Sequence, residues 1–195
     1  RTQAYYNSGG WRATWSGEGG GVLMNQCPHN IDLWQWIFGM PCAIYANCEF
    51  GKYHDIEVED DVTAMAEYEN GATATFITTT GDACGTNRLE ITGDKGKIVV
   101  EHGKLCWWKL DVPEREFCFT SKEGFSTPSN TYEEFTAPEP EGHPEVLEAF
   151  AQSILNGTEI FNGMVEPTLD TMVESCALFY DPERLFPASV DIEIK

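Results

Sequence analysis

One stretch near the start of the chain concentrates side chains that can do acid–base chemistry. Read as a helix, residues 22–38 place four of them on one side, opposite an apolar stripe; these are Asn25, His29, Asp32 and Trp36. An imidazole exchanges a proton with a hydroxyl near neutral pH, and a nearby carboxylate fixes its tautomer or raises its pKa. We therefore predict that His29 is catalytic and that the other three bind substrate. The same pattern also suits a solvated helix face or a structural histidine.

The element that must hold these side chains is predicted to be a helix over Val22–Phe38. Its apolar stripe comprises Leu23, Cys27, Ile31, Trp34 and Phe38. Gly39 supplies a C-terminal stop. Pro28 cannot donate to the carbonyl of Met24 and should kink the first turns. If the regular helix begins only at Pro28, Asn25 leaves the shared face.

The region from Pro41 to Leu110 changes to strand patterns. DVTAMAEY and ATATFITTT flank Glu69-Asn70-Gly71 and predict a hairpin. RLEIT and KIVVE flank residues 93–96 and predict a second one, which LCWWKL follows as the next strand. These hairpins predict a largely antiparallel open sheet.

The remaining segments complete an α+β fold with helices packed on one face of that sheet. Residues 1–21 read as a loop, and residues 111–142 as loops with two short strands near Glu116–Thr120 and Tyr132–Phe135. Two helices, His143–Leu155 and Glu166–Leu178, and a last strand, Ser189–Ile194, follow. We predict one domain over residues 1–195, which its abrupt start suggests is a fragment of a longer polypeptide.

The polar loop Lys52–Asp61 joins two predicted strands and suits either a substrate-contacting loop, in which His54 binds substrate, or a solvated acidic one. Its HDxExEDD run also resembles a metal site. Carboxylates that alternate along a strand point to opposite faces, so we predict no metal there. Gly17–Gly21 does not match GxGxxG and does not follow a strand, so we predict a flexible entry to the helix instead of a cofactor site.

Composition excludes several classes of partner. The chain carries 32 acidic and 12 basic residues, a net charge of −20, which repels nucleic acid and anionic membranes. No apolar run is long enough to span a bilayer. Seven cysteines without zinc-ligand spacing predict free thiols in the cytoplasm, with a Cys42–Cys48 disulfide as the alternative.

Several motifs together resemble one protein family. GGGVLMNQCPHNIDLWQWIFGMP, preceded by WRATW, is similar to the start of the C-terminal domain of the Gfo/Idh/MocA oxidoreductases. DDVTAMAEYENGATATFITTTG, EITGDKGKIVVE and HPEVLEAFAQSILNG resemble the same family, so the likeness covers nearly the whole chain.

This resemblance implies an NAD- or NADP-dependent dehydrogenase of a sugar, inositol or other polyol, whose cofactor is bound by an N-terminal Rossmann domain that also supplies a catalytic lysine. It implies that His29 is the catalytic histidine, and Asn25 stands where the family often has aspartate. An asparagine cannot be a base, although its amide can orient a hydroxyl. The resemblance and an uncovered sheet face both predict a homo-oligomer. The alternatives are an NAD-dependent glycosidase of the same family and a non-catalytic sugar-binding or assembly module.

Overall fold

The computed structural model describes residues 1–136, 143–157 and 190–193. They form two compact units. The first comprises residues 1–83 with the strand at 190–193, and the second comprises the described residues from 84 to 157. The strands divide between two four-stranded antiparallel sheets, one in each unit. The predicted α+β class is therefore confirmed.

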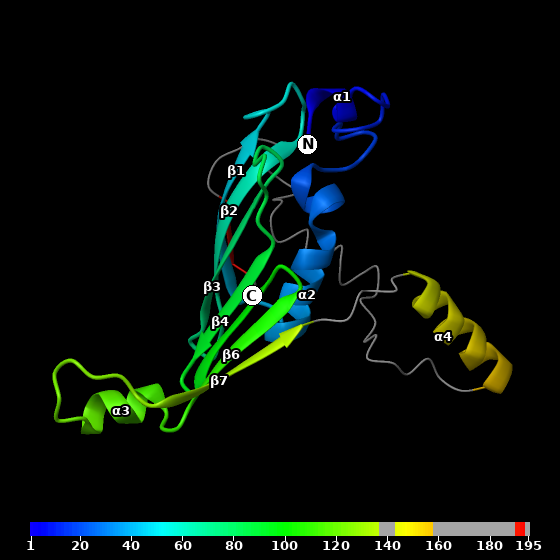
Figure 1. The fold of residues 1–195 in the computed structure, drawn as a ribbon. Helices are drawn as coiled ribbons and strands as arrows, with labels where there is room; N and C mark the ends of the chain where they lie inside the picture. Colours follow the sequence, from blue (N-terminus) through cyan, green and yellow to red (C-terminus); the bar gives the residue numbers. More distant parts are fainter. Residues whose placement is uncertain (137–142, 158–189, 194–195) are drawn as a thin grey trace. The chain divides into compact units, whose positions relative to one another are not determined.

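The first unit contains a sheet and three short helical elements (Figure 1). Its helices are α1 (Gln3–Tyr6), the π-helix η1 (Val22–Gln26) and α2 (Pro28–Phe38). Its strands are β1 (Ala43–Phe50), β2 (Glu59–Glu67), β3 (Thr73–Thr79) and β8 (Val190–Glu193), in the order β3-β2-β1-β8. The predicted hairpin is the β2–β3 pair, and the described part of the last predicted strand is β8.

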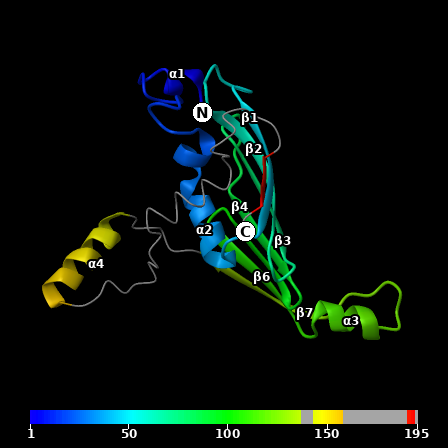
Figure 2. The same cartoon turned by 180° about the vertical axis from the view of Figure 1, so that it is seen from behind.

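The core of this unit lies between the η1–α2 segment and one face of the sheet. The apolar stripe of the helices meets the alternate small and branched residues of β1 and β2; the buried cluster comprises Val22, Leu23, Cys27, Ile31, Trp34, Ile44, Ala46, Val62, Ala64, Ala66 and Tyr68. Trp34 stacks on Phe76 of β3, with ring centroids 5.3 Å apart. Figure 2 shows α2 running along this sheet face. Helices therefore pack on one face of the first sheet, as the patterns predict.

The predicted helix over Val22–Phe38 is divided at Cys27. Because Pro28 has no N–H, it serves as the first residue of α2. The preceding turn widens, so that the Cys27 amide donates to the Val22 carbonyl at 3.0 Å. Asn25 consequently belongs to η1, whereas His29, Asp32 and Trp36 belong to α2. Gly39 ends α2 with a φ of 75°, as predicted.

The second unit is a meander of four strands. They are β4 (Arg88–Gly93), β5 (Gly96–Glu101), β6 (Lys104–Leu110) and β7 (Asn130–Thr136), paired in that order. They match the second predicted hairpin, LCWWKL and the predicted strand at Tyr132–Phe135. The helix α4 (His143–Asn156) is also confirmed. The predicted helix Glu166–Leu178 lies outside the described residues.

The predicted strand at Glu116–Thr120 is wrong, because these residues belong to the helix α3 (Glu114–Thr120). Asp94 in the β4–β5 turn caps it: the Glu114 amide donates to the Asp94 carbonyl at 2.7 Å, and the Arg115 amide donates to Oδ1 at 2.8 Å. This cap comes from a distant turn, so the local pattern did not reveal it. Among the described helices, none has the length and apolarity needed to cross a bilayer.

Candidate functional site

A network of polar side chains surrounds Asn25 at the C-terminal end of η1. Its amide nitrogen donates to Oε1 of Glu18. Its oxygen accepts from Gln26 Nε2 at 2.8 Å and from the Tyr5 hydroxyl at 3.3 Å. The Tyr5 hydroxyl in turn accepts from Nη1 of Arg12 at 3.0 Å. We call Tyr5, Arg12, Glu18, Asn25 and Gln26 the Asn25 cluster.

The loop before η1 holds the Glu18 carboxylate by backbone contacts. The Ala13 amide donates to Oε2 of Glu18 at 2.6 Å, and Ala13 adopts a left-handed φ of 52° while almost completely buried. Such a conformation is unfavourable for a residue with a Cβ and recurs at functional sites. A Cβ at Gly17 would lie 2.4 Å from the Trp11 carbonyl oxygen, so the tight turn requires glycine there. Residues 13–18, which the sequence predicts to be loop, therefore form an ordered turn that fixes the Glu18 carboxylate.

A second carboxylate fixes the start of η1. Glu59 of β2 is fully buried; its two oxygens accept from the Gly21 amide at 2.9 Å each, and Oε1 also accepts from Leu23 at 3.1 Å. A Cβ on Gly21 would lie 1.9 Å from the Glu59 carbonyl oxygen. The end of the glycine run is thus pinned to the sheet, which corrects the predicted flexible entry.

This pinning also tests the fit of a nicotinamide dinucleotide. Phosphate-binding turns offer free backbone N–H groups to the pyrophosphate. Here the amide of Gly21 is already taken by a carboxylate, whose charge repels phosphate. The residues of this glycine run therefore do not fit the phosphates of such a cofactor.

Three predicted site residues lie on α2. His29 and Trp36 are exposed, Trp36 with 59% of its surface accessible, and Asp32 is half-buried. Their spacing of three and four residues places them on one side of the helix. His29 is exposed to solvent in this arrangement. The structure therefore leaves the imidazole accessible, and its catalytic role stays a prediction.

His54 lies in a different environment, because both of its ring nitrogens are engaged. Nδ1 lies 3.0 Å from Oδ2 of Asp60, and Nε2 lies 3.2 Å from the Arg1 carbonyl oxygen. Its ring packs edge-on against Tyr6 with centroids 4.9 Å apart. Buried Asp60 also accepts from the amides of residues 52–54. In this arrangement His54 orders the loop, and substrate binding by it stays untested.

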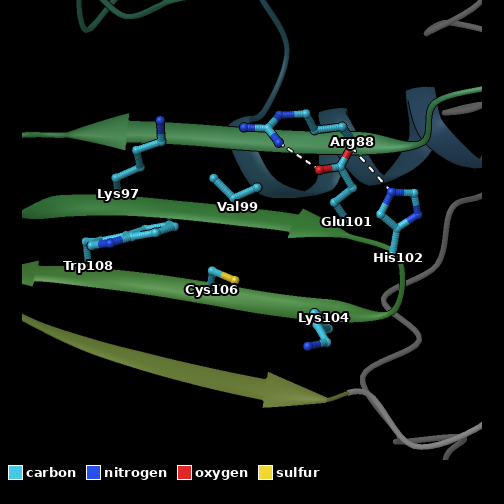
Figure 3. Close-up of a pocket in the computed structure, with 8 residues that line it drawn as sticks. All are labelled: Arg88, Lys97, Val99, Glu101, His102, Lys104, Cys106 and Trp108. Carbon is cyan, nitrogen blue, oxygen red and sulfur yellow. Dashed lines mark hydrogen bonds and ion pairs between the residues drawn. The ribbon is translucent and has the colours of Figure 1, made fainter.

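A separate hollow lies on the second unit (Figure 3). It has a volume of about 600 Å³ and is lined by Arg88, Lys97, Val99, Glu101, His102, Lys104, Cys106 and Trp108. Its cations are paired: Arg88 contacts Glu90 at 2.6 Å and Glu101 at 2.8 Å. It contains no predicted site residue. Across the described part of the chain, no three histidine, cysteine, aspartate or glutamate side chains gather as metal ligands.

Sequence reasoning missed the partners of Asn25. Tyr5, Arg12 and Glu18 lie in a segment without a regular period, so no pattern assigned them a direction. The carboxylates of Glu59 and Asp60 were read together as either solvated or substrate-contacting, yet each is buried on its own set of amides. The available signal was the dense Gly and Trp content of the segment that ends in the glycine run. Such content indicates a tight turn but does not identify its contacts.

Comparison with known proteins agrees with this fold. The model of the GFO/IDH/MocA C-terminal domain matches residues 1–99, and the chain belongs to this family. Comparison with the curated proteins finds no match.

Three solved structures illustrate the likeness. The WlbA dehydrogenase from Bordetella pertussis, in complex with NADH and UDP-GlcNAcA, is 24% identical, with a TM-score of 0.60 over 92% of this chain and 46% of that one. Levoglucosan dehydrogenase, in complex with NADH and levoglucosan, is 19% identical, with a TM-score of 0.60 over 95% and 54%. An oxidoreductase from Thermotoga maritima is 21% identical, with a TM-score of 0.56 over 89% and 43%. The chain thus spans about half the length of these proteins, which share its fold.

Proposed function

We propose that this chain is the substrate-binding domain of an NAD- or NADP-dependent dehydrogenase that acts on a sugar, inositol or related polyol. A separate N-terminal Rossmann domain of the same protein binds the cofactor. The observation that carries the proposal is an accessible imidazole on α2 immediately after a fixed network of hydrogen-bonding side chains. Family membership supports the same class of reaction.

In this mechanism His29 accepts the proton of the substrate hydroxyl at a ring nitrogen. The nicotinamide, when bound, supplies the hydride acceptor. Loss of a proton from the hydroxyl accompanies loss of hydride from its carbon, so a base at this position lowers the barrier to oxidation. Asp32 and Trp36 lie on the same side of the same helix and contact the substrate, Trp36 by stacking on a sugar ring.

The Asn25 cluster suits a polyhydroxylated ligand because it offers both donors and acceptors. Gln26 Oε1 is a buried acceptor without a hydrogen-bond donor among the described residues. A hydroxyl of the substrate can donate to it, and buried polar atoms normally have such partners. Asn25 itself orients the substrate through its amide.

We further propose that the protein is a homo-oligomer through the outer face of the first sheet. Tyr45, Met65 and Ile77 expose 44%, 44% and 70% of their surfaces there. Tyr45 is paired with Met65, and Ile77 is paired with Thr63, so they form one patch across three strands. Light scattering of the full-length protein at micromolar concentration tests this proposal, and a strict monomer would remove it.

The central experiment measures turnover by the full-length protein that contains this chain. NAD or NADP reduction is followed with D-glucose, D-xylose, myo-inositol and levoglucosan. We expect His29→Asn to lower kcat by about a hundredfold to ten-thousandfold while the protein stays folded, since it removes a positioned base. His102→Asn is the matched control, because His102 is exposed in the second unit and asparagine tolerates its φ of 51°.

Other outcomes identify other functions. Near-normal kcat in His29→Asn would make the imidazole structural. Release of a sugar from a glycoside, with NAD retained on the protein, would identify the glycosidase. Absence of turnover with the whole panel would favour a non-catalytic module.

A further inference from the structure

The hydrogen bonds of the Asn25 cluster run in one direction. Arg12 has only donors at one end, and ionised Glu18 has only acceptors at the other. Because the Tyr5 hydroxyl accepts from Arg12, its proton is directed to Asn25 Oδ1. Because Glu18 takes the Asn25 amide nitrogen, Oδ1 must be the atom that faces the donors. The two charged ends therefore decide which way the Asn25 amide is turned.

From this direction we infer that Glu18 is a positioning residue for the proposed dehydrogenase reaction, and that it holds Asn25 Oδ1 as an acceptor for a substrate hydroxyl. The inference rests on the proposed function. Oδ1 holds Gln26 Nε2 at 2.8 Å but the Tyr5 hydroxyl at 3.3 Å, and the longer of these contacts is the one that a substrate hydroxyl replaces.

The environment of Glu18 requires a carboxylate. Its two oxygens face two N–H donors, the Ala13 amide on Oε2 and the Asn25 side chain on Oε1. A glutamine at this position accepts at only one atom and presents an NH₂ group to the other donor. The loop supports the carboxylate with the left-handed Ala13, and the Glu18 amide is tied to the Thr14 carbonyl at 2.9 Å. The turn thus fixes the backbone from which the Glu18 side chain extends, and the Ala13 amide restrains its carboxylate.

This arrangement also explains why residue 25 is an amide although the family resemblance favours aspartate. An aspartate at 25 would place two carboxylates in hydrogen-bonding contact, and they could not both ionise at low cost. With an amide at 25, the same site keeps one negative charge, on Glu18.

The decisive test exchanges the carboxylate at position 18 with the amide at position 25. We expect Glu18→Gln in the full-length enzyme to lower kcat/KM by about tenfold to a hundredfold. In this variant the Asn25 amide rotates by half a turn, so that its NH₂ group, and no longer Oδ1, faces the substrate hydroxyl. Asn25→Asp alone should be similarly impaired. The double variant Glu18→Gln/Asn25→Asp should recover most of the loss, because an amide at 18 accepts from Ala13 and donates to a carboxylate at 25, whose other oxygen faces the substrate.

A pH profile separates this role from a merely structural one. In Asn25→Asp the two carboxyl groups share one proton, so at least one pKa rises. Activity should then fall as the pH rises past that raised pKa, and the double variant should lose this dependence. The other titratable groups of the cluster are Tyr5 and Arg12.

Three results would overturn the inference: near-normal kcat/KM in Glu18→Gln, no recovery in the double variant, or an unchanged pH profile in Asn25→Asp. The unfolding free energies of the same four proteins give a readout without substrate. They should show Asn25→Asp losing stability as pH rises and the double variant restored. If no panel substrate is turned over by the wild type, the proposed function fails, while this stability cycle still decides whether Glu18 and Asn25 are paired.

Discussion

The two units use charged side chains in opposite ways. In the first, Glu59 and Asp60 are fully buried and accept hydrogen bonds from backbone amides, Glu59 from Gly21 and Leu23 and Asp60 from residues 52–54 of the preceding loop. In the second, Arg88, Lys97 and Lys104 form ion pairs with Glu90, Glu101 and Glu134 on an exposed sheet face. Exposed pairs contribute little to stability, because water and salt screen them. A buried carboxylate that accepts from two backbone amides is costly to remove, because the amides are shielded from water and would be left without a hydrogen-bond acceptor.

The largest contrast should be in thiol reactivity. Burial, with the charge of Glu59 adding, raises the pKa of the Cys48 thiol to about 12. At pH 8 this lowers its thiolate fraction about a thousandfold relative to an ordinary thiol, and the fraction rises tenfold per pH unit up to that pKa. We expect iodoacetamide to label exposed Cys118 long before Cys48, as measured by peptide mass spectrometry. Equal labelling rates of Cys48 and Cys118 in the folded protein would contradict the burial of the Cys48 thiol beside Glu59.

Removal of a buried charge should come next. Glu59→Gln keeps the side-chain volume but places an NH₂ donor against the N–H donor of Gly21. We therefore expect the free energy of unfolding, measured in urea, to fall by about 2–4 kcal/mol. The matched change Glu90→Gln removes a carboxylate that contacts Arg88 on the exposed face. It should leave the unfolding midpoint unchanged. A comparable shift in both variants would erase the distinction between the units.

Gly21→Ala tests the close approach of the glycine run to β2. The added Cβ would meet the Glu59 backbone, so either η1 or the strand must move, at a cost of about 1–3 kcal/mol or more. Gly10→Ala is the control, because a Cβ there meets nothing within 4 Å. Thermal unfolding should show a lower Tm only for Gly21→Ala, and an unchanged Tm would mean that the contact is absent.

The smallest expected signal is in cofactor binding. Titration calorimetry of this chain with NAD and NADP should show no micromolar binding, because Glu59 occupies the Gly21 amide and the net charge of −20 opposes pyrophosphate. The longer protein with the Rossmann domain that we propose is the positive control. Micromolar binding by the chain alone would show that the glycine run, or another part of it, does hold phosphate.

Much of the fold was predictable because it depends on local patterns. The alternation in DVTAMAEY and ATATFITTT, with Glu69-Asn70-Gly71 between them, identified the β2–β3 hairpin from neighbouring residues alone. Gly39 identified the end of α2 for the same reason, whereas the helix was predicted to begin at Val22 and Pro28 indicated only a kink or an alternative start. The strand expected at Glu116–Thr120 failed because its helix is capped by Asp94, about 20 residues earlier in the chain.

By itself, the sequence determined the fold class, the hairpins and the C-terminal end of α2, since side-chain period and turn chemistry are properties of short segments. It also selected His29, whose catalytic role stays a prediction. Only the tertiary structure decided which groups the carboxylates near the start of α2 accept hydrogen bonds from. Glu18 reaches Asn25, and Glu59 reaches Gly21, through contacts between segments that no period relates. A carboxylate has no preferred partner until folding places a donor within about 3 Å of it, so its role could not be derived from its position in the chain.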